Sequence, residues 1–143
     1  MILSVSCNAQ NEKDYVNNFS HKSVEYNSLV KFLIENKQEF LNPDCNKMSL
    51  SLREQCEAGC FPTMQDSLNY YLDMDIFQTI EFYQDKSIEF LLNVEANSKS
   101  DFERKYYFVY VLVDKLPAIY KNSKVHKELS PHWWYIETED AYY

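Results

Sequence analysis

The sequence predicts an α+β fold in which about three N-terminal helices pack on a C-terminal antiparallel sheet of about four strands. Apolar residues recur every three or four positions early in the chain, whereas β-branched and aromatic residues concentrate after residue 75. Helices followed by consecutive strands are typical of this fold class. The 143 residues, of which 45% are apolar and 25% charged, are enough for one domain with its own core.

The helical half contains three predicted segments. The first helix spans 23–41 and ends before Pro43, because the residue that precedes a proline avoids the helical conformation. The second spans 49–58 and stops at Gly59, the only glycine of the chain. The third begins after Pro62, where apolar residues return at helical spacing.

The second half contains four predicted strands. Residues 76–82 and 88–94 each alternate between apolar and polar side chains, and the polar stretch between them is typical of a hairpin turn. Residues 105–113 are the strongest strand candidate, because their aromatic and β-branched side chains favour a sheet. After a polar stretch, residues 132–138 add the fourth strand.

The hairpin has one register that places its apolar side chains on a single face. Pairing Phe82 with Ile88 achieves this, and a slip by one residue would scatter the apolar groups over both faces. The same register sets Glu81 directly opposite Glu89, a like-charged pair that costs stability. The face opposite the core then carries the acidic residues Asp75, Glu81, Glu89 and Glu95. Two interpretations remain open: a solvated face, or a surface that binds a basic partner.

Strand 105–113 is apolar on both faces. We expect Tyr106 and Phe108 to face the core, and the side with Tyr107 and Val109 to be covered by another element of the chain. The alternative is an exposed apolar patch, which would mark a binding site.

Charge is distributed unevenly along the chain. The net charge is −8, from 14 basic and 22 acidic residues, which argues against binding to nucleic acid or to an anionic membrane surface. Segment 54–103 holds eleven acidic residues and two lysines, whereas 115–127 holds four lysines and no acid. Such asymmetry favours rapid, oriented encounter with a charged protein.

No catalytic site or cofactor is predicted. One glycine cannot form a glycine-rich phosphate loop, and His126 and His132 are interpreted as loop and strand-end residues rather than general bases. Three cysteines lie in the helical half, namely Cys45, Cys56 and Cys60. No histidine near them completes a zinc site, so no metal is predicted. In an exported protein one of their three pairings would form a disulfide.

Residues 1–15 end a short apolar run at Cys7 and continue into a polar stretch. This pattern resembles the end of a bacterial lipoprotein signal peptide of the form seen in Bacteroidota, although only six residues precede Cys7 and none is basic. The resemblance implies lipid attachment at Cys7 and a lipid-anchored protein of the cell envelope or periplasm. Residues 1–21 would then be signal remnant and tether, and 22–143 one α+β domain. The alternative is the frayed terminus of a cytoplasmic protein.

In size, acidity, uneven charge and tyrosine content, the chain resembles the small immunity proteins of bacterial toxin systems. The resemblance implies a non-enzymatic inhibitor that binds a basic toxin or effector. The implied contact residues are Asp75, Glu81, Glu89, Glu95 and Tyr107. The alternative is a small envelope lipoprotein with a cystatin-like or NTF2-like ligand-binding domain. A deep pocket between helix 24–41 and the sheet would favour that alternative, whereas a filled core and a flat acidic face would favour the inhibitor.

Overall fold

The computed structural model describes residues 2–40, 65–72, 78–83, 85–96 and 102–141. An antiparallel five-stranded sheet with helices on it confirms the α+β class. The elements are α1 (Ile2–Glu35), α2 (Lys37–Phe40), α4 (Gln65–Leu72), β1 (Thr79–Tyr83), β2 (Ser87–Ala96), β3 (Phe102–Val111), α5 (Ala118–Lys121), β4 (Val125–Ser130) and β5 (Trp133–Ala141).

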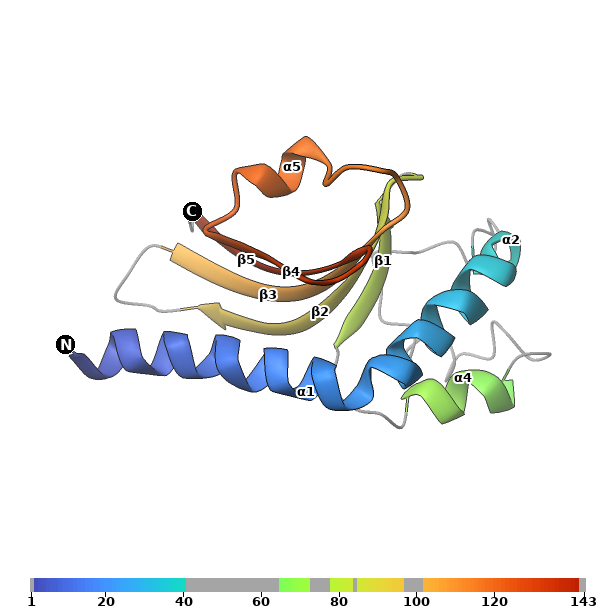
Figure 1. Ribbon diagram of the computed structural model, residues 1–143, viewed down its shortest axis with the longest axis horizontal. Helices are drawn as coiled ribbons and strands as arrows, with labels where there is room; N and C mark the ends of the chain where they lie inside the picture. The colour runs from blue at the N-terminus through green and yellow to red at the C-terminus, as the bar shows by residue number, and fades with distance from the viewer. Residues whose placement is uncertain (1, 41–64, 73–77, 84, 97–101, 142–143) are drawn as a thin grey trace.

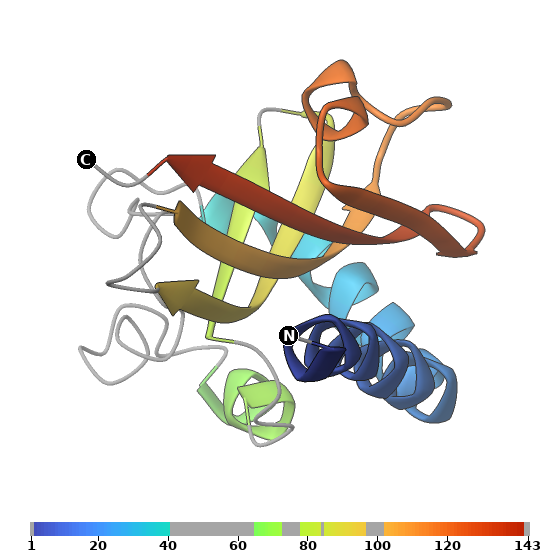
Figure 2. The same ribbon diagram turned by 90° about the vertical axis from the view of Figure 1, so that its left-hand side faces the viewer.

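The sheet has the strand order β1-β2-β3-β5-β4. After β3 the chain passes through α5 to the outer edge, forms β4 there, and returns as β5 between β4 and β3. The curved sheet has α1 along one face and α5 over the other (Figure 1), and Figure 2 shows α1 nearly end-on below the strands. We call these the α1 face and the far face. The α1 face carries Phe90, Phe108 and Trp133, and the far face carries Glu89 and Val109.

Aromatic rings fill the space between α1 and the sheet. Phe19 stacks on Tyr26 with 5.7 Å between ring centroids and lies 5.2 Å from Trp133. Tyr26 lies 5.4 Å from Phe108. All four side chains are at most 3% exposed, so this region is packed core. The indole N–H of Trp133 is satisfied by Asn27 Oδ1 at 2.9 Å.

The predicted hairpin register is confirmed. Phe82 pairs with Ile88 and Glu81 pairs with Glu89 across β1 and β2. The two faces of strand β3 are confirmed as well. Tyr106 and Phe108 lie in the core beneath α1, whereas Val109 packs in a second cluster with Tyr120 of α5 and Ile136 of β5. The far face is therefore partly covered by α5. This agrees with the expectation that another element of the chain covers the side of the strand with Tyr107 and Val109.

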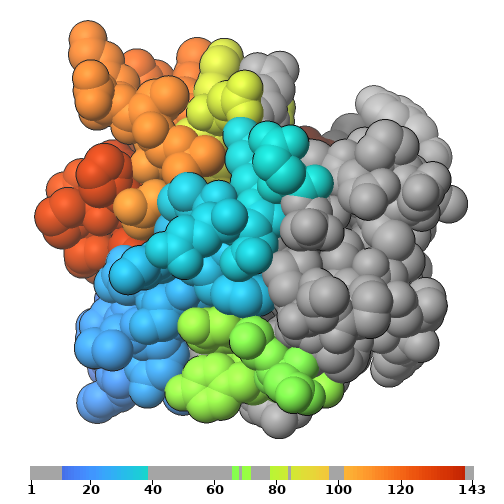
Figure 3. Space-filling view, turned by 90° about the vertical axis from the view of Figure 1, so that its right-hand side faces the viewer, coloured from blue at the N-terminus to red at the C-terminus, as the bar shows by residue number. Residues whose placement is uncertain are grey.

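The strand count and the helical half differ from the prediction. The sheet has five strands rather than four, because Val125–Ser130 forms β4 in a segment expected to be an irregular polar stretch. Its polar side chains suit an edge strand, whose outer side meets water. One long helix replaces the first predicted helix. The third is confirmed over α4, which Figure 3 shows against the second half of α1, with Phe32 and Tyr71 rings 5.4 Å apart. The predicted helix 49–58 lies outside the described residues, as do Asp75, Cys45, Cys56 and Cys60.

Residues 8–21, which the sequence analysis assigned to a tether, are helical. They belong to α1, and Tyr15 and Phe19 pack against the sheet. These two rings are four residues apart and so share one helix face. Lys13, Asn17 and Ser20 on the other side of the helix are exposed. A break in helical geometry at Lys22 (φ −118°, ψ 20°) separates this part from the rest of α1. Cys7 also lies within α1, and its lipid attachment remains a prediction.

None of the helices in the described ranges combines the length and the apolar character needed to span a bilayer.

Candidate functional site

Two pairs of like-charged carboxylates lie on the far face. Glu81 faces Glu89 across β1 and β2, and Glu103 faces Asp140 across β3 and β5. Tyr107 lies four residues from Glu103 along β3, so both side chains are on the far face, and Tyr107 lies between the two pairs. Like charges directly opposite each other destabilise a sheet by a few tenths of a kcal/mol to about 1 kcal/mol per pair. The chain thus carries this cost twice on one surface.

Glu95 does not belong to this acidic face, contrary to the prediction. The pairing of β2 with β3 shifts between Leu91 and Asn93, which is a β-bulge. One extra residue in a strand reverses the faces of all residues beyond it. Glu95 therefore points to the α1 face, where it accepts hydrogen bonds from Tyr106 Oη (2.8 Å) and Asn11 Nδ2 (3.2 Å).

Glu89 is held in place by a chain of hydroxyl groups. Tyr120 Oη donates to Glu89 Oε2 at 2.5 Å, and the Ser87 and Tyr120 hydroxyls are 2.6 Å apart. Since Tyr120 gives its proton to Glu89, Ser87 donates to Tyr120. Burial raises the pKa of Glu89, and the charge of Glu81 adds to this, while Tyr120 and Lys105 act in the opposite direction. The carboxylate is thus partly desolvated and short of positive charge.

Tyr107 lies in the field of all four carboxylates. Burial raises the pKa of its hydroxyl, and the charges of Glu89, Glu81, Asp140 and Glu103 raise it further. Burial likewise raises the pKa of Tyr120, followed by the charge of Glu89. Both hydroxyls therefore stay protonated at neutral pH and act as neutral hydrogen-bonding groups rather than as bases.

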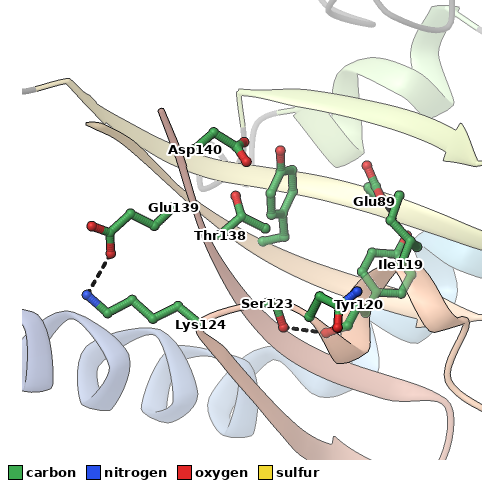
Figure 4. Close-up of a pocket in the computed structure, with 10 residues that line it drawn as sticks. Glu89, Ile119, Tyr120, Ser123, Lys124, Thr138, Glu139 and Asp140 are labelled. Atoms are coloured by element: carbon green, nitrogen blue, oxygen red, sulfur yellow. Dashed lines mark hydrogen bonds and ion pairs between the residues drawn. The ribbon is translucent and has the colours of Figure 1, made fainter. Parts of the chain in front are cut away.

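The nearby lysines neutralise only part of this charge. Lys105 Nζ lies 3.4 Å from Glu103 Oε1, and Lys124 Nζ lies 2.7 Å from Glu139 Oε2. Figure 4 shows the Lys124–Glu139 pair at one end of the site and Glu89 at the other. Four carboxylates against Lys105 leave the far face with a clear negative excess.

The site is hollowed beside α5. A cavity of about 590 Å³ opens between α5 and strands β3 and β5. It is lined by Glu89, Tyr107, Ile119, Tyr120, Asn122, Ser123, Lys124, Thr138, Glu139 and Asp140. Its volume falls within the range of about 300–1,000 Å³ that is common for ligand sites. The hollow thus combines aromatic walls with carboxylates.

A second acidic group lies buried on the α1 face. Glu137 is 3% exposed and accepts a hydrogen bond from Tyr135 Oη at 2.9 Å. Burial raises the pKa of Glu137, and the charge of Glu12 on α1 raises it further, whereas Tyr135, Arg104 and Lys124 lower it. This carboxylate is a structural feature of the contact between α1 and the sheet.

Glu137→Gln should remove a pH dependence of folding. The raised pKa means that the folded protein holds the Glu137 proton more tightly than the unfolded chain does. The contribution of Glu137 to the free energy of unfolding therefore rises as pH falls from the raised pKa toward the ordinary value of 4.5. Urea unfolding between about pH 7 and about pH 5 measures the slope. The slope should flatten in Glu137→Gln and persist in Glu35→Gln, a change on the exposed side of α1. An unchanged slope in Glu137→Gln would contradict the assignment.

The two histidines near β5, His126 and His132, contact the backbone or an aromatic ring. His132 has a ring nitrogen 2.9 Å from the carbonyl oxygen of Val111 and adopts a positive φ of 72° in the β4–β5 turn. The ring of His126 lies beside that of Trp134, with 6.3 Å between ring centroids and an angle of 39° between the ring planes. Within the described ranges, no three His, Cys, Asp or Glu side chains are grouped so as to hold a metal ion.

The chain is matched by no protein-family model, no curated protein and no solved structure. Its function is therefore inferred from the geometry and charge of the far face.

The sequence prediction located Glu81, Glu89 and Tyr107 but missed Glu103, Asp140 and Tyr120. The alternation that contains Tyr107 includes Glu103, so this residue was within reach of the same reasoning. Asp140 required knowing that β5 extends past residue 138 and pairs with β3. Tyr120 reaches Glu89 only because α5 folds over the sheet, which no local pattern indicates.

Proposed function

We propose that this protein is a non-enzymatic inhibitor of the immunity-protein type, which binds a basic toxin or effector through the far face of its sheet. The observation that carries this proposal is that one surface holds two cross-strand pairs of carboxylates, Glu81–Glu89 and Glu103–Asp140. A partner that supplies positive charge relieves their repulsion. The repulsion between these carboxylates in the free protein therefore favours formation of a complex with a basic partner.

Partial burial distinguishes this surface from an ordinary solvated face. Glu89 is bonded by Tyr120, and burial raises its pKa, whereas a fully solvated carboxylate has neither feature. Tyr107, beside it, is a residue type that contributes strongly to binding energy at protein interfaces. A desolvated carboxylate beside a rigid tyrosine is the kind of centre around which protein interfaces form.

The uneven charge supports the same proposal at longer range. A negative surface steers a basic partner toward the far face and accelerates association, an effect that falls as salt screens it. The ligand-binding alternative required a deep pocket between the long helix and the sheet. In the described residues Phe19, Tyr26, Phe108 and Trp133 fill the middle of that space, which supports the inhibitor. The acidic face is hollowed beside α5 rather than flat, so its shape does not meet the other expectation for an inhibitor.

The test is capture of a partner from the encoding organism, beginning with the product of any secreted-effector gene adjacent to the gene for this protein. The double variant Glu81→Gln/Glu89→Gln should lose the partner, because two of the four carboxylates are neutralised. The matched variant Glu25→Gln/Glu35→Gln, with the same change of net charge on α1, should keep it. Capture should also weaken as salt is raised. Equal capture by both variants, or no stable partner at all, would overturn the proposal.

A further inference from the structure

We propose that the hollow beside α5 receives the guanidinium group of an arginine side chain presented by the partner. This inference rests on the proposed function and specifies what the far face recognises. It assigns the hollow a ligand chemistry, an arginine side chain, rather than a general preference for basic surfaces.

The charge of the hollow selects a cation. Glu89 and Asp140 line it. The charges of these two residues, and those of Glu81 and Glu103 nearby, all act on the hydroxyl of Tyr107. Lys105 is engaged with Glu103, and Lys124 with Glu139. Lys124, which lines the hollow, and Lys105, whose charge also acts on Glu89 from nearby, therefore each have another acidic partner. Glu89 and Asp140 keep negative charge for a ligand.

The bonding groups fit a flat, forked donor. Tyr120 occupies Glu89 Oε2, and in the described part of the structure Glu89 Oε1 and the hydroxyl of Tyr107 have no hydrogen-bond partner. A guanidinium group carries five N–H donors in one plane and stacks on aromatic rings while it binds carboxylates. An ammonium group is a strongly hydrated point charge and gains less from a ring wall. The combination of tyrosine and carboxylate thus favours arginine over lysine.

The hollow also accommodates the rest of the arginine side chain. Ile119 of α5 lines the hollow and is 53% exposed, so it offers an apolar contact to the aliphatic stem. Ser87 and Tyr120 fix the carboxylate of Glu89 before any ligand arrives. A binding group that is already positioned loses little freedom on binding, which favours affinity.

The probe for this inference is Nα-acetyl-L-arginine amide, with Nα-acetyl-L-citrulline amide as its neutral isostere. Titration of the isotopically labelled protein, followed by NMR, should give saturable shifts at Glu89, Tyr107 and Tyr120 for the arginine compound. The affinity of the citrulline compound should be lower by a factor of about ten or more, and a factor of ten corresponds to about 1.4 kcal/mol. Nα-acetyl-L-lysine amide should also bind more weakly than the arginine compound. Citrulline or lysine compounds that bind as tightly as arginine would overturn the inference.

Variants separate the site from general charge effects. Glu89→Gln and, independently, Asp140→Asn should each weaken arginine binding several-fold, whereas Glu35→Gln should leave it unchanged. Asp140 is exposed, so its variant should fold normally even if Glu89→Gln disturbs the contact with Tyr120. Equal weakening by Glu35→Gln, or none by Asp140→Asn, would contradict the site. If a partner is captured through the far face but the arginine compound does not bind, this inference fails while the proposed function stands.

Discussion

Replacing Phe19 with alanine is expected to lower the free energy of unfolding by about 3–5 kcal/mol. Phe19 is 3% exposed, and its ring lies 5.4 Å from Phe108 and 5.2 Å from Trp133. Truncation would open a cavity between α1 and the sheet that neighbouring rings cannot close without leaving their own contacts. Urea unfolding monitored by tryptophan fluorescence measures the loss.

The matched control for Phe19→Ala is Val24→Ala on the same helix. Val24 is 75% exposed, so its truncation should change the free energy of unfolding by no more than about 0.5 kcal/mol. The comparison decides whether residues 8–21 are part of the folded unit or a tether. Equal small effects of both substitutions would favour the tether.

Glu81→Lys is expected to stabilise the fold and to weaken partner binding at the same time. The substitution turns the like-charged pair with Glu89 into an opposite-charged pair, which should raise the free energy of unfolding by about 0.5–1.5 kcal/mol. The new positive charge repels a basic partner and competes with it for Glu89. Affinity should fall by about 30-fold or more, or about 2 kcal/mol. Urea unfolding and calorimetric titration with the captured partner measure the two effects.

Glu35→Lys provides the control for this charge change. Glu35 is exposed on α1, so the same change of net charge should alter partner affinity much less. A stabilised Glu81→Lys variant that keeps full affinity would show that the far face is simply solvated. A variant that loses both stability and affinity would contradict the repulsion between Glu81 and Glu89.

The hairpin of β1 and β2 shows how far sequence reasoning reaches. Its register follows from local alternation, because only one pairing places Ile80, Phe82, Ile88 and Phe90 together on the core face. That register places Glu81 opposite Glu89 without any knowledge of the rest of the fold. Two members of the candidate site were therefore accessible from the sequence.

The bulge in β2 marks where this reasoning ends. Leu92 and the residues beyond it continue the alternating pattern, yet the insertion moves Glu95 to the α1 face, where it binds Tyr106 and Asn11. A bulge depends on how a strand pairs with its neighbour, and that neighbour lies elsewhere in the chain. Strand β4 escaped prediction for a related reason. As an edge strand it buries little, so its sequence lacks the apolar alternation that identifies buried strands.

The sequence by itself determined the α+β class, the hairpin register, the two apolar sides of strand β3 and the acidic pair Glu81–Glu89. Each of these follows from side chains close together in the chain, because burial acts on their local periodicity. Only the tertiary structure decided that Glu95 leaves the acidic face, that Asp140 joins it beside Glu103, and that Tyr120 holds Glu89. These contacts join residues 11 to 84 positions apart, on different strands and helices, so no local pattern specifies them.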